Sequence, residues 1–199
     1  MGCWGITAFE SDAGLDTVEL IRRNLPEDGR LELEKIIEIL RQDNWSAPPD
    51  VTNGESHTSP MALAEIVVKL LDQDMEGLDY TEKWVAQNNK FSSVNSFSTS
   101  KESVQWLHDY ISDTLKYARE NAANGRKWSG WFQEQDWNGW QKHMEGLIGR
   151  LDMLLTFPEN SIELALPQEQ GNRSITNREK EENKKETGMK SKFLRKYQD

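Results

Sequence analysis

Apolar residues recur at intervals of three and four along most of the chain up to about residue 155, which is the spacing of one helix face. This periodicity predicts six helices, over about residues 12–24, 31–43, 59–71, 80–88, 100–124 and 137–154. Alternating apolar and polar positions, which would indicate strands, are almost absent. We therefore expect an all-α fold, a single helical bundle-like domain of about six helices.

The last two predicted helices carry the most regular pattern. Six apolar residues from Trp137 to Leu154 follow one another at spacings of 3, 4, 3, 4 and 3, and a similar row runs from Val104 to Ala122. Two such rows predict a pair of antiparallel helices in a bundle. The polar stretches 45–60 and 91–100 are expected to be connectors.

The charge of the chain is unevenly distributed. The 199 residues contain 24 Lys and Arg against 34 Asp and Glu, a net charge of −10. Residues 167–199 contain nine of these bases and six of these acids, so residues 1–166 hold 15 bases and 28 acids, an excess of 13 negative charges. We expect an acidic helical domain over 1–166 and a charged tail over 167–199, either disordered or helical.

This composition narrows the class of protein. An acidic surface repels nucleic acid and attracts cationic partners. No apolar run approaches the roughly 18 residues of a membrane-spanning helix, and no secretory signal is visible at the start. The single cysteine, Cys3, cannot form an intramolecular disulfide, which favours a reducing compartment. These features predict a cytoplasmic protein with no nucleic-acid or membrane partner.

Motifs of catalysis and metal binding are missing from the sequence. It contains no nucleophile elbow, phosphate-binding glycine loop or dinucleotide fingerprint, and its three histidines lack zinc spacing. A calcium-like segment begins at Asp72, but Lys83 stands where the loop needs a bidentate Glu. We therefore predict no catalytic residue, no metal and no cofactor, and a function other than catalysis.

Tryptophan is unusually abundant, with eight residues in the chain. Trp137 and Trp140 begin an apolar row and are expected in the core. Trp128 and Trp131 lie before that row, where they could either anchor the core or form an exposed aromatic patch. Exposed aromatic residues often dominate the binding energy of protein interfaces.

The chain opens with a motif of glycine, aromatic and acidic residues, which comprises Gly2, Trp4, Gly5, Phe9, Glu10, Asp12, Leu15 and Asp16. It resembles the start of the bacterial domain-of-unknown-function 4259 family. Residues 62–67 and the stretch 131–151 are similar to a central and a closing helix of that family, so the likeness covers about residues 1–155. The resemblance implies a small helical cytosolic protein without an established activity. Members of the family have been proposed to act as immunity- or antitoxin-like partners.

Two interpretations of the opening motif follow from its residue types. In the structural one, Gly2 and Gly5 permit a tight turn, Trp4 and Phe9 plug the bundle, and Glu10 with Asp12 caps the first helix. In the functional one, acidic residues line a cleft that receives a cationic group, and they are Glu10, Asp12, Asp16, Glu65 and Glu134.

The leading functional prediction is a non-enzymatic acidic protein that masks a basic protein partner. The residues predicted to bind this partner are Glu10, Asp12, Asp16, Glu65, Trp128, Trp131 and Glu134. One alternative is a small-ligand binder or an enzyme with a carboxylate-lined pocket. Another is a structural subunit that oligomerises through Trp128 and Trp131.

Overall fold

The computed structural model describes residues 2–53, 55–75, 77–79, 90–126 and 134–166. Its helices and strands, in chain order, are α1 (Asp12–Arg23), β1 (Arg30–Glu32), α2 (Leu33–Gln42), α3 (Thr58–Leu71), β2 (Ser96–Ser100), α4 (Lys101–Ala123), α5 (Trp137–Leu155) and β3 (Ser161–Ala165). Outside the described residues lie the helix predicted near 80–88, Trp128, Trp131 and the tail 167–199.

The all-α prediction is wrong, because the described residues form five α-helices and a three-stranded sheet. Strand β2 is central, with β1 parallel on one side and β3 antiparallel on the other. The stretch 91–100, expected to be a connector, contains β2. Its alternation is real, with Phe97 and Thr99 buried, but the remaining residues are serines, which rarely mark strands. Strand β1 has only three residues, too few for a visible pattern.

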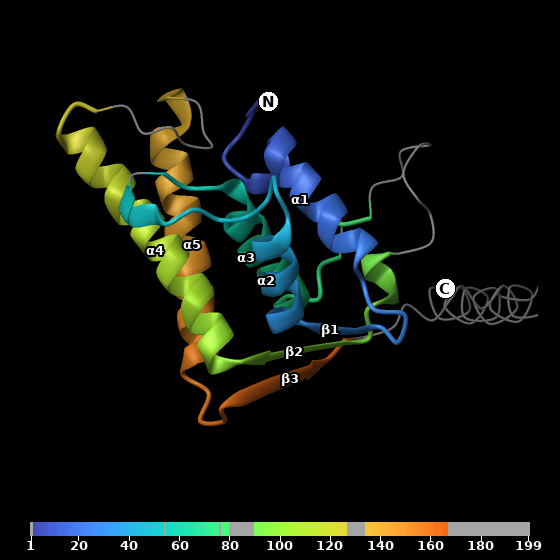
Figure 1. The fold of residues 1–199 in the computed structure, drawn as a ribbon. Coiled ribbons are helices and arrows are strands. Elements are labelled where there is room, and N and C mark those ends of the chain that lie inside the picture. The colour runs from blue at the N-terminus through green and yellow to red at the C-terminus, as the bar shows by residue number, and fades with distance from the viewer. Residues whose placement is uncertain (1, 54, 76, 80–89, 127–133, 167–199) are drawn as a thin grey trace, which may run out of the picture. The chain divides into compact units, whose positions relative to one another are not determined.

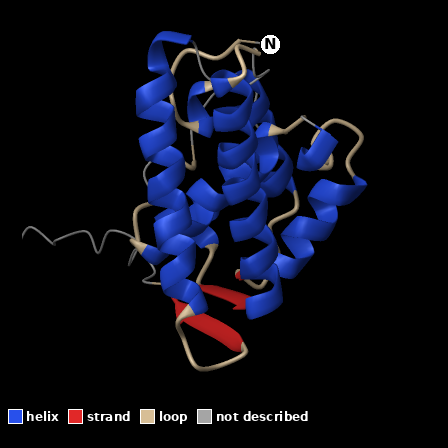
Figure 2. Ribbon diagram, turned by 90° about the vertical axis from the view of Figure 1, so that its left-hand side faces the viewer, coloured by secondary structure: helices blue, strands red, loops and turns tan. Residues whose placement is uncertain are grey.

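The sheet lies at one end of the helices (Figures 1 and 2). Leu31, Phe97 and Leu164 occupy paired positions on the three strands and form one apolar row. Helix α2 follows β1 directly, and α4 follows β2 directly. Because β1 and β2 are neighbouring parallel strands, the two helices leave the sheet side by side. This arrangement creates the space between α2 and α4 that is described below.

Several predicted features of the helices are confirmed. Helix α3 is central, with eleven of its fourteen residues buried. Helices α4 and α5 pack against each other along the predicted apolar rows, antiparallel in Figure 1. Trp140 is fully buried at the start of α5, and the partly buried Trp137 stacks on it with ring centroids 5.6 Å apart. Within the described residues, no helix is long and apolar enough to cross a membrane.

The first turn of α1 is packed against the segment that precedes it. Ser11 is the N-cap of α1, and its hydroxyl accepts a hydrogen bond from the Gly14 amide. A Cβ at Gly14 would overlap the backbone carbonyl of Ala8, which is completely buried. Glycine is therefore required here for close approach of two backbone segments rather than for an unusual backbone angle.

The close approach at Gly14 can be tested by adding one methyl group. We expect Gly14→Ala to lower the free energy of unfolding by about 2 kcal/mol, because the backbone of Ala8 has to move. Gly146→Ala is the matched control, because it also adds a methyl group to a helix but meets nothing within 4 Å. It should stabilise the protein by about 1 kcal/mol. Urea unfolding measures both, and equal effects of the two variants would contradict the interpretation.

Candidate functional site

Residues 2–11 form a looped segment, called the strap below, which precedes α1. The strap folds back on itself through an antiparallel bridge between Cys3 and Ser11. The Trp4 amide donates to the Glu10 carbonyl at 2.9 Å, and the Asp12 amide donates to the Gly2 carbonyl at 3.1 Å. The Gly2 amide in turn donates to the Asp12 carboxylate at 2.6 Å. The opening motif is thus a closed loop with its own hydrogen bonds.

A buried carboxylate on α3 attaches the strap to the helices. Glu65 is only 5% exposed, and its Oε1 accepts a hydrogen bond from the Ala8 amide at 2.7 Å. The same oxygen lies 2.6 Å from Nε2 of His143 on α5. Oε2 of Glu65 is buried and has no hydrogen-bond partner among the residues that the structure describes. Glu65 therefore joins three segments that are distant in the sequence.

A second carboxylate organises the strap internally. Oε2 of Glu10 accepts hydrogen bonds from the amides of Ile6 and Thr7 and from the Thr7 hydroxyl, at 3.0–3.1 Å. The hydrogen bond from the Thr7 amide is the largest cause of a pKa below the ordinary value for Glu10, and nearby His143 contributes to it. A Cβ at Gly5 would overlap this carboxylate, so a larger residue there would push the Glu10 side chain out of its position.

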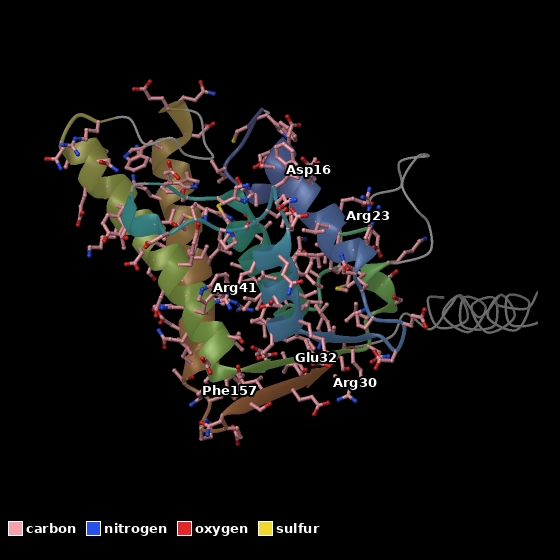
Figure 3. All side chains as sticks on the ribbon, in the orientation of Figure 1. Asp16, Arg23, Arg30, Glu32, Arg41 and Phe157 are labelled. Atoms are coloured by element: carbon pink, nitrogen blue, oxygen red, sulfur yellow. The ribbon has the colours of Figure 1, made fainter. Side chains whose placement is uncertain are left out.

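The structure gives the predicted partner-binding residues different surroundings. Glu10 and Glu65 hold the strap through the bonds described above. Asp12 and Asp16 are exposed on α1, where Figure 3 labels Asp16. Glu134 is exposed before α5. The Asp12 carboxylate already accepts the Gly2 amide within the strap loop, and binding of a partner through these acidic residues stays a prediction.

The two aromatic residues of the strap differ in burial. Phe9 packs against the core, in agreement with the prediction that it plugs the bundle. The same prediction for Trp4 is wrong, since this residue is 53% exposed. The Trp4 backbone is engaged in the bridged loop, and this geometry leaves the indole at the surface.

A cavity of about 430 Å³ opens between α2, α4 and the loop that precedes α3. Its lining comprises Arg41, Pro48, Pro49, Asp50, Val51, Trp106, Asp109, Tyr110 and Asp113. One wall is aromatic, with the ring centroids of Trp106 and Tyr110 5.9 Å apart. We call this cavity the α2–α4 pocket.

The charges of the pocket are unbalanced, with three carboxylates against one guanidinium. Asp109 accepts a hydrogen bond from Gln105 at 2.7 Å and lies 2.9 Å from His108, whereas Asp113 has no hydrogen bond or ion pair within the described residues. Asp50 accepts from the hydroxyl and the amide of Thr52, and these bonds hold its pKa below the ordinary value. The pocket is therefore a place where a cation would be attracted.

Arg41, the one cation among the described residues of the lining, lies over an aromatic ring. The Arg41 guanidinium carbon lies 4.9 Å from the centroid of the Trp106 ring. Arg41 is exposed, and it makes no hydrogen bond or ion pair within the described residues. Figure 3 shows Arg41 on the side of α2 that faces α4. A cation–π contact thus positions this side chain beside the three carboxylates without pairing it with any of them.

The loop over the pocket is ordered by polar contacts. The Ser59 hydroxyl donates to the Ser46 carbonyl at 2.6 Å, and the His57 amide donates to the Tyr110 hydroxyl at 3.1 Å. Burial raises the pKa of Tyr110 to about 12, so the hydroxyl stays protonated at neutral pH. Burial lowers the pKa of His57. Its neutral ring accepts a hydrogen bond from the Ser59 amide at the start of α3. These contacts preform the pocket.

The sequence contains a signal for this pocket that lies outside the apolar rows of the helices. Trp106, Asp109, Tyr110 and Asp113 stand at positions i, i+3, i+4 and i+7, and so share one face of α4. That face lies beside the apolar row of the same helix and alternates aromatic with acidic residues. The two prolines that complete the pocket come from a loop whose path the sequence does not reveal.

The described residues contain no group of three or more His, Cys, Asp or Glu side chains that could hold a metal ion. Comparisons of the chain with protein-family models, curated proteins and solved structures found no match. The resemblance of the opening motif to the bacterial family therefore stays a prediction.

Removing the buried carboxylate should release the strap. We expect Glu65→Ala to lower the free energy of unfolding by about 3 kcal/mol, because the Ala8 amide and His143 both lose their acceptor. Hydrogen exchange of the strap amides should accelerate before global unfolding. Glu65→Gln retains a hydrogen-bond acceptor and should lower the free energy of unfolding by less than Glu65→Ala does. Asp16→Ala, at an exposed position on α1, should change stability by under about 0.5 kcal/mol. Unchanged exchange in Glu65→Ala would contradict the attachment.

The Glu10 carboxylate should make stability depend on pH. The pKa of Glu10 is lower in the folded chain, so its stabilisation is present above the unfolded-state pKa and is lost as pH falls through the folded-state pKa. Glu10→Gln should therefore be less stable than the native chain at pH 7, and the difference should shrink toward pH 3. Urea unfolding at both pH values measures the difference. Glu163→Gln, at an exposed position of β3, is the control. A constant difference between Glu10→Gln and the native chain would refute it.

Proposed function

We propose that the protein binds and masks a basic protein partner in the cytoplasm, in the manner of an immunity protein, and that the α2–α4 pocket receives a cationic side chain of this partner. The observation that carries the proposal is the pocket's composition. Three carboxylates and two aromatic rings surround a cavity that contains one opposing charge. Cations bind well where carboxylates lie beside an aromatic face, since both attract positive charge.

The charge of the whole domain supports a basic partner. Residues 1–166 carry an excess of 13 negative charges, so their field attracts a basic protein over distances beyond contact. Such steering raises the association rate and weakens as salt is added. The pocket then supplies the local contacts that an overall negative charge lacks.

An exposed tryptophan next to the pocket supports a protein as the partner. Trp45 is 85% exposed and lies three residues before Pro48, which lines the pocket. The Asp43 carboxylate accepts hydrogen bonds from the amides of Trp45 and Ser46, so the backbone that carries the indole is held in place. A fixed, exposed tryptophan offers a large contact area at little entropic cost. A small ion could not make use of this contact area, whereas a protein could.

The size of the pocket supports a second candidate function. A volume of about 430 Å³ lies within the range of small-molecule sites, and a small organic cation would suit the lining. A thermal-shift panel of amines and amino-acid amides tests this candidate. A ligand at 100 times its dissociation constant adds about 2.7 kcal/mol of stability, and a panel without any shift would count against it.

The masking proposal predicts which substitutions abolish binding. The protein is immobilised and exposed to native lysate at low and moderate salt, and captured proteins are identified by mass spectrometry. We expect one stoichiometric basic protein that is released as salt rises. Asp113→Asn should weaken its binding about tenfold, and Trp45→Ala should weaken it by at least as much without changing the melting temperature, because the indole is exposed.

Substitutions elsewhere on the acidic surface serve as the comparison. Glu102→Gln neutralises an exposed residue in the first turn of α4 and should leave capture unchanged. A triple variant that neutralises Asp12, Asp16 and Glu134 tests the face predicted from the sequence. If the triple variant loses the partner and Asp113→Asn keeps it, the partner binds at the strap end. If no acidic substitution affects capture, the masking proposal is wrong.

A further inference from the structure

We infer that the α2–α4 pocket is a guanidinium site and that Arg41 occupies it as an internal competitor, which an arginine side chain of a partner displaces. This inference rests on the proposed function and names the chemical group that the pocket accepts. It begins from the contact between Arg41 and Trp106, with 4.9 Å between the guanidinium carbon and the ring centroid. The chain itself thus shows that a guanidinium fits over this aromatic wall.

The attachment of Arg41 is weak enough for exchange. Its guanidinium has five N–H donors, and none of them has a hydrogen bond or ion pair within the described residues. The stack on Trp106 is its one described side-chain contact, and an exposed cation–π contact contributes about 0.5–1 kcal/mol. An arginine that stacks on Trp106 and also pairs with a carboxylate would be held more strongly than Arg41.

A carboxylate for such a pair is already in the lining. Asp113 is partly buried, lies one helical turn after Asp109 and Tyr110, and has no partner within the described residues. Guanidinium binds carboxylates through two parallel hydrogen bonds and stacks on aromatic rings, whereas ammonium does not offer this planar geometry. The pocket therefore favours arginine over lysine.

Arg41 also explains how an acidic pocket can limit the binding of cations other than its specific ligand. While Arg41 lies over Trp106, the excess of negative charge in the lining is two rather than three, and the ring face is covered. A ligand has to displace Arg41 before it can bind, which reduces its apparent affinity by the fraction of time that the site is open. Removing Arg41 should accordingly strengthen binding.

The test uses N-acetyl-arginine amide as the probe. Its binding is followed by the indole NMR signal of Trp106, assigned with Trp106→Phe in the full chain. We expect Arg41→Gln to tighten binding about three- to sixfold relative to the native chain, the gain that follows from freeing a site closed by a contact of about 0.5–1 kcal/mol. N-acetyl-lysine amide should bind several-fold more weakly, and N-acetyl-citrulline amide, which has the same shape without the charge, should not bind. Asp113→Asn should weaken the arginine probe about tenfold.

Arg30→Gln is the control for overall charge, since it removes one exposed cation on β1, outside the pocket lining. It should leave the affinity of the probe unchanged. Unchanged or weaker binding in Arg41→Gln would overturn the inference, as would equal tightening in both arginine variants. Binding of N-acetyl-glutamate amide that depends on Arg41 would also overturn it, because Arg41 would then be an anion ligand.

Failure of this inference is distinguishable from failure of the proposed function. If Arg41→Gln does not tighten probe binding but Asp113→Asn still loses the captured protein, the pocket binds the partner and the displacement idea alone is wrong. If the arginine probe behaves as expected but pocket substitutions leave protein capture intact, the guanidinium site stands and the masking proposal is wrong.

Discussion

The hydrogen bonds of the buried Glu65 side chain are the interaction on which the arrangement of this domain depends. A polar side chain that is 5% exposed needs hydrogen-bond partners within the protein, because burial of an unpaired polar group is costly. Two come from different parts of the chain, the Ala8 amide in the strap and Nε2 of His143 on α5. Since Glu65 itself lies on the central helix α3, the strap and α5 are held to one residue. Both of these contacts are made by the same oxygen, Oε1.

Small residues make this arrangement possible at the places where backbone segments meet. Gly14 lies against the Ala8 carbonyl, and Gly139 on α5 leaves room for Ile6, whose methyl carbon would lie 3.3 Å from an added Cβ. The opening motif therefore has a structural explanation, in which glycines admit the strap and carboxylates hold it. Trp4 is the exception, because about half of this residue is exposed and the predicted role as a plug of the bundle does not explain it.

The strap and the α2–α4 pocket use acidic residues in opposite ways. At the strap, one carboxylate oxygen of Glu10 and one of Glu65 are each engaged by two or more groups of the protein itself. In the pocket, Asp113 has no partner in the described part of the chain, and Arg41 stacks on Trp106 without pairing with any carboxylate. Satisfied carboxylates stabilise a fold, whereas unsatisfied ones beside a cavity are available for binding. This contrast, more than the number of acidic residues, directs the functional proposal to the pocket.

Helical periodicity by itself determined α1, the central role of α3 and the pairing of α4 with α5, because each has a continuous apolar row that only one face can bury. It did not reveal the sheet, since β1 has three residues and β2 alternates serine with two inward side chains. Residue types left open whether Glu10 caps a helix or lines an acidic cleft, and they placed Glu65 only in that cleft, because a sequence does not show which amide or imidazole will lie beside a carboxylate. The pocket was decided by tertiary structure alone. Parallel pairing of β1 with β2 sets α2 beside α4, and only then do Arg41 and Trp106, 65 positions apart, come into contact.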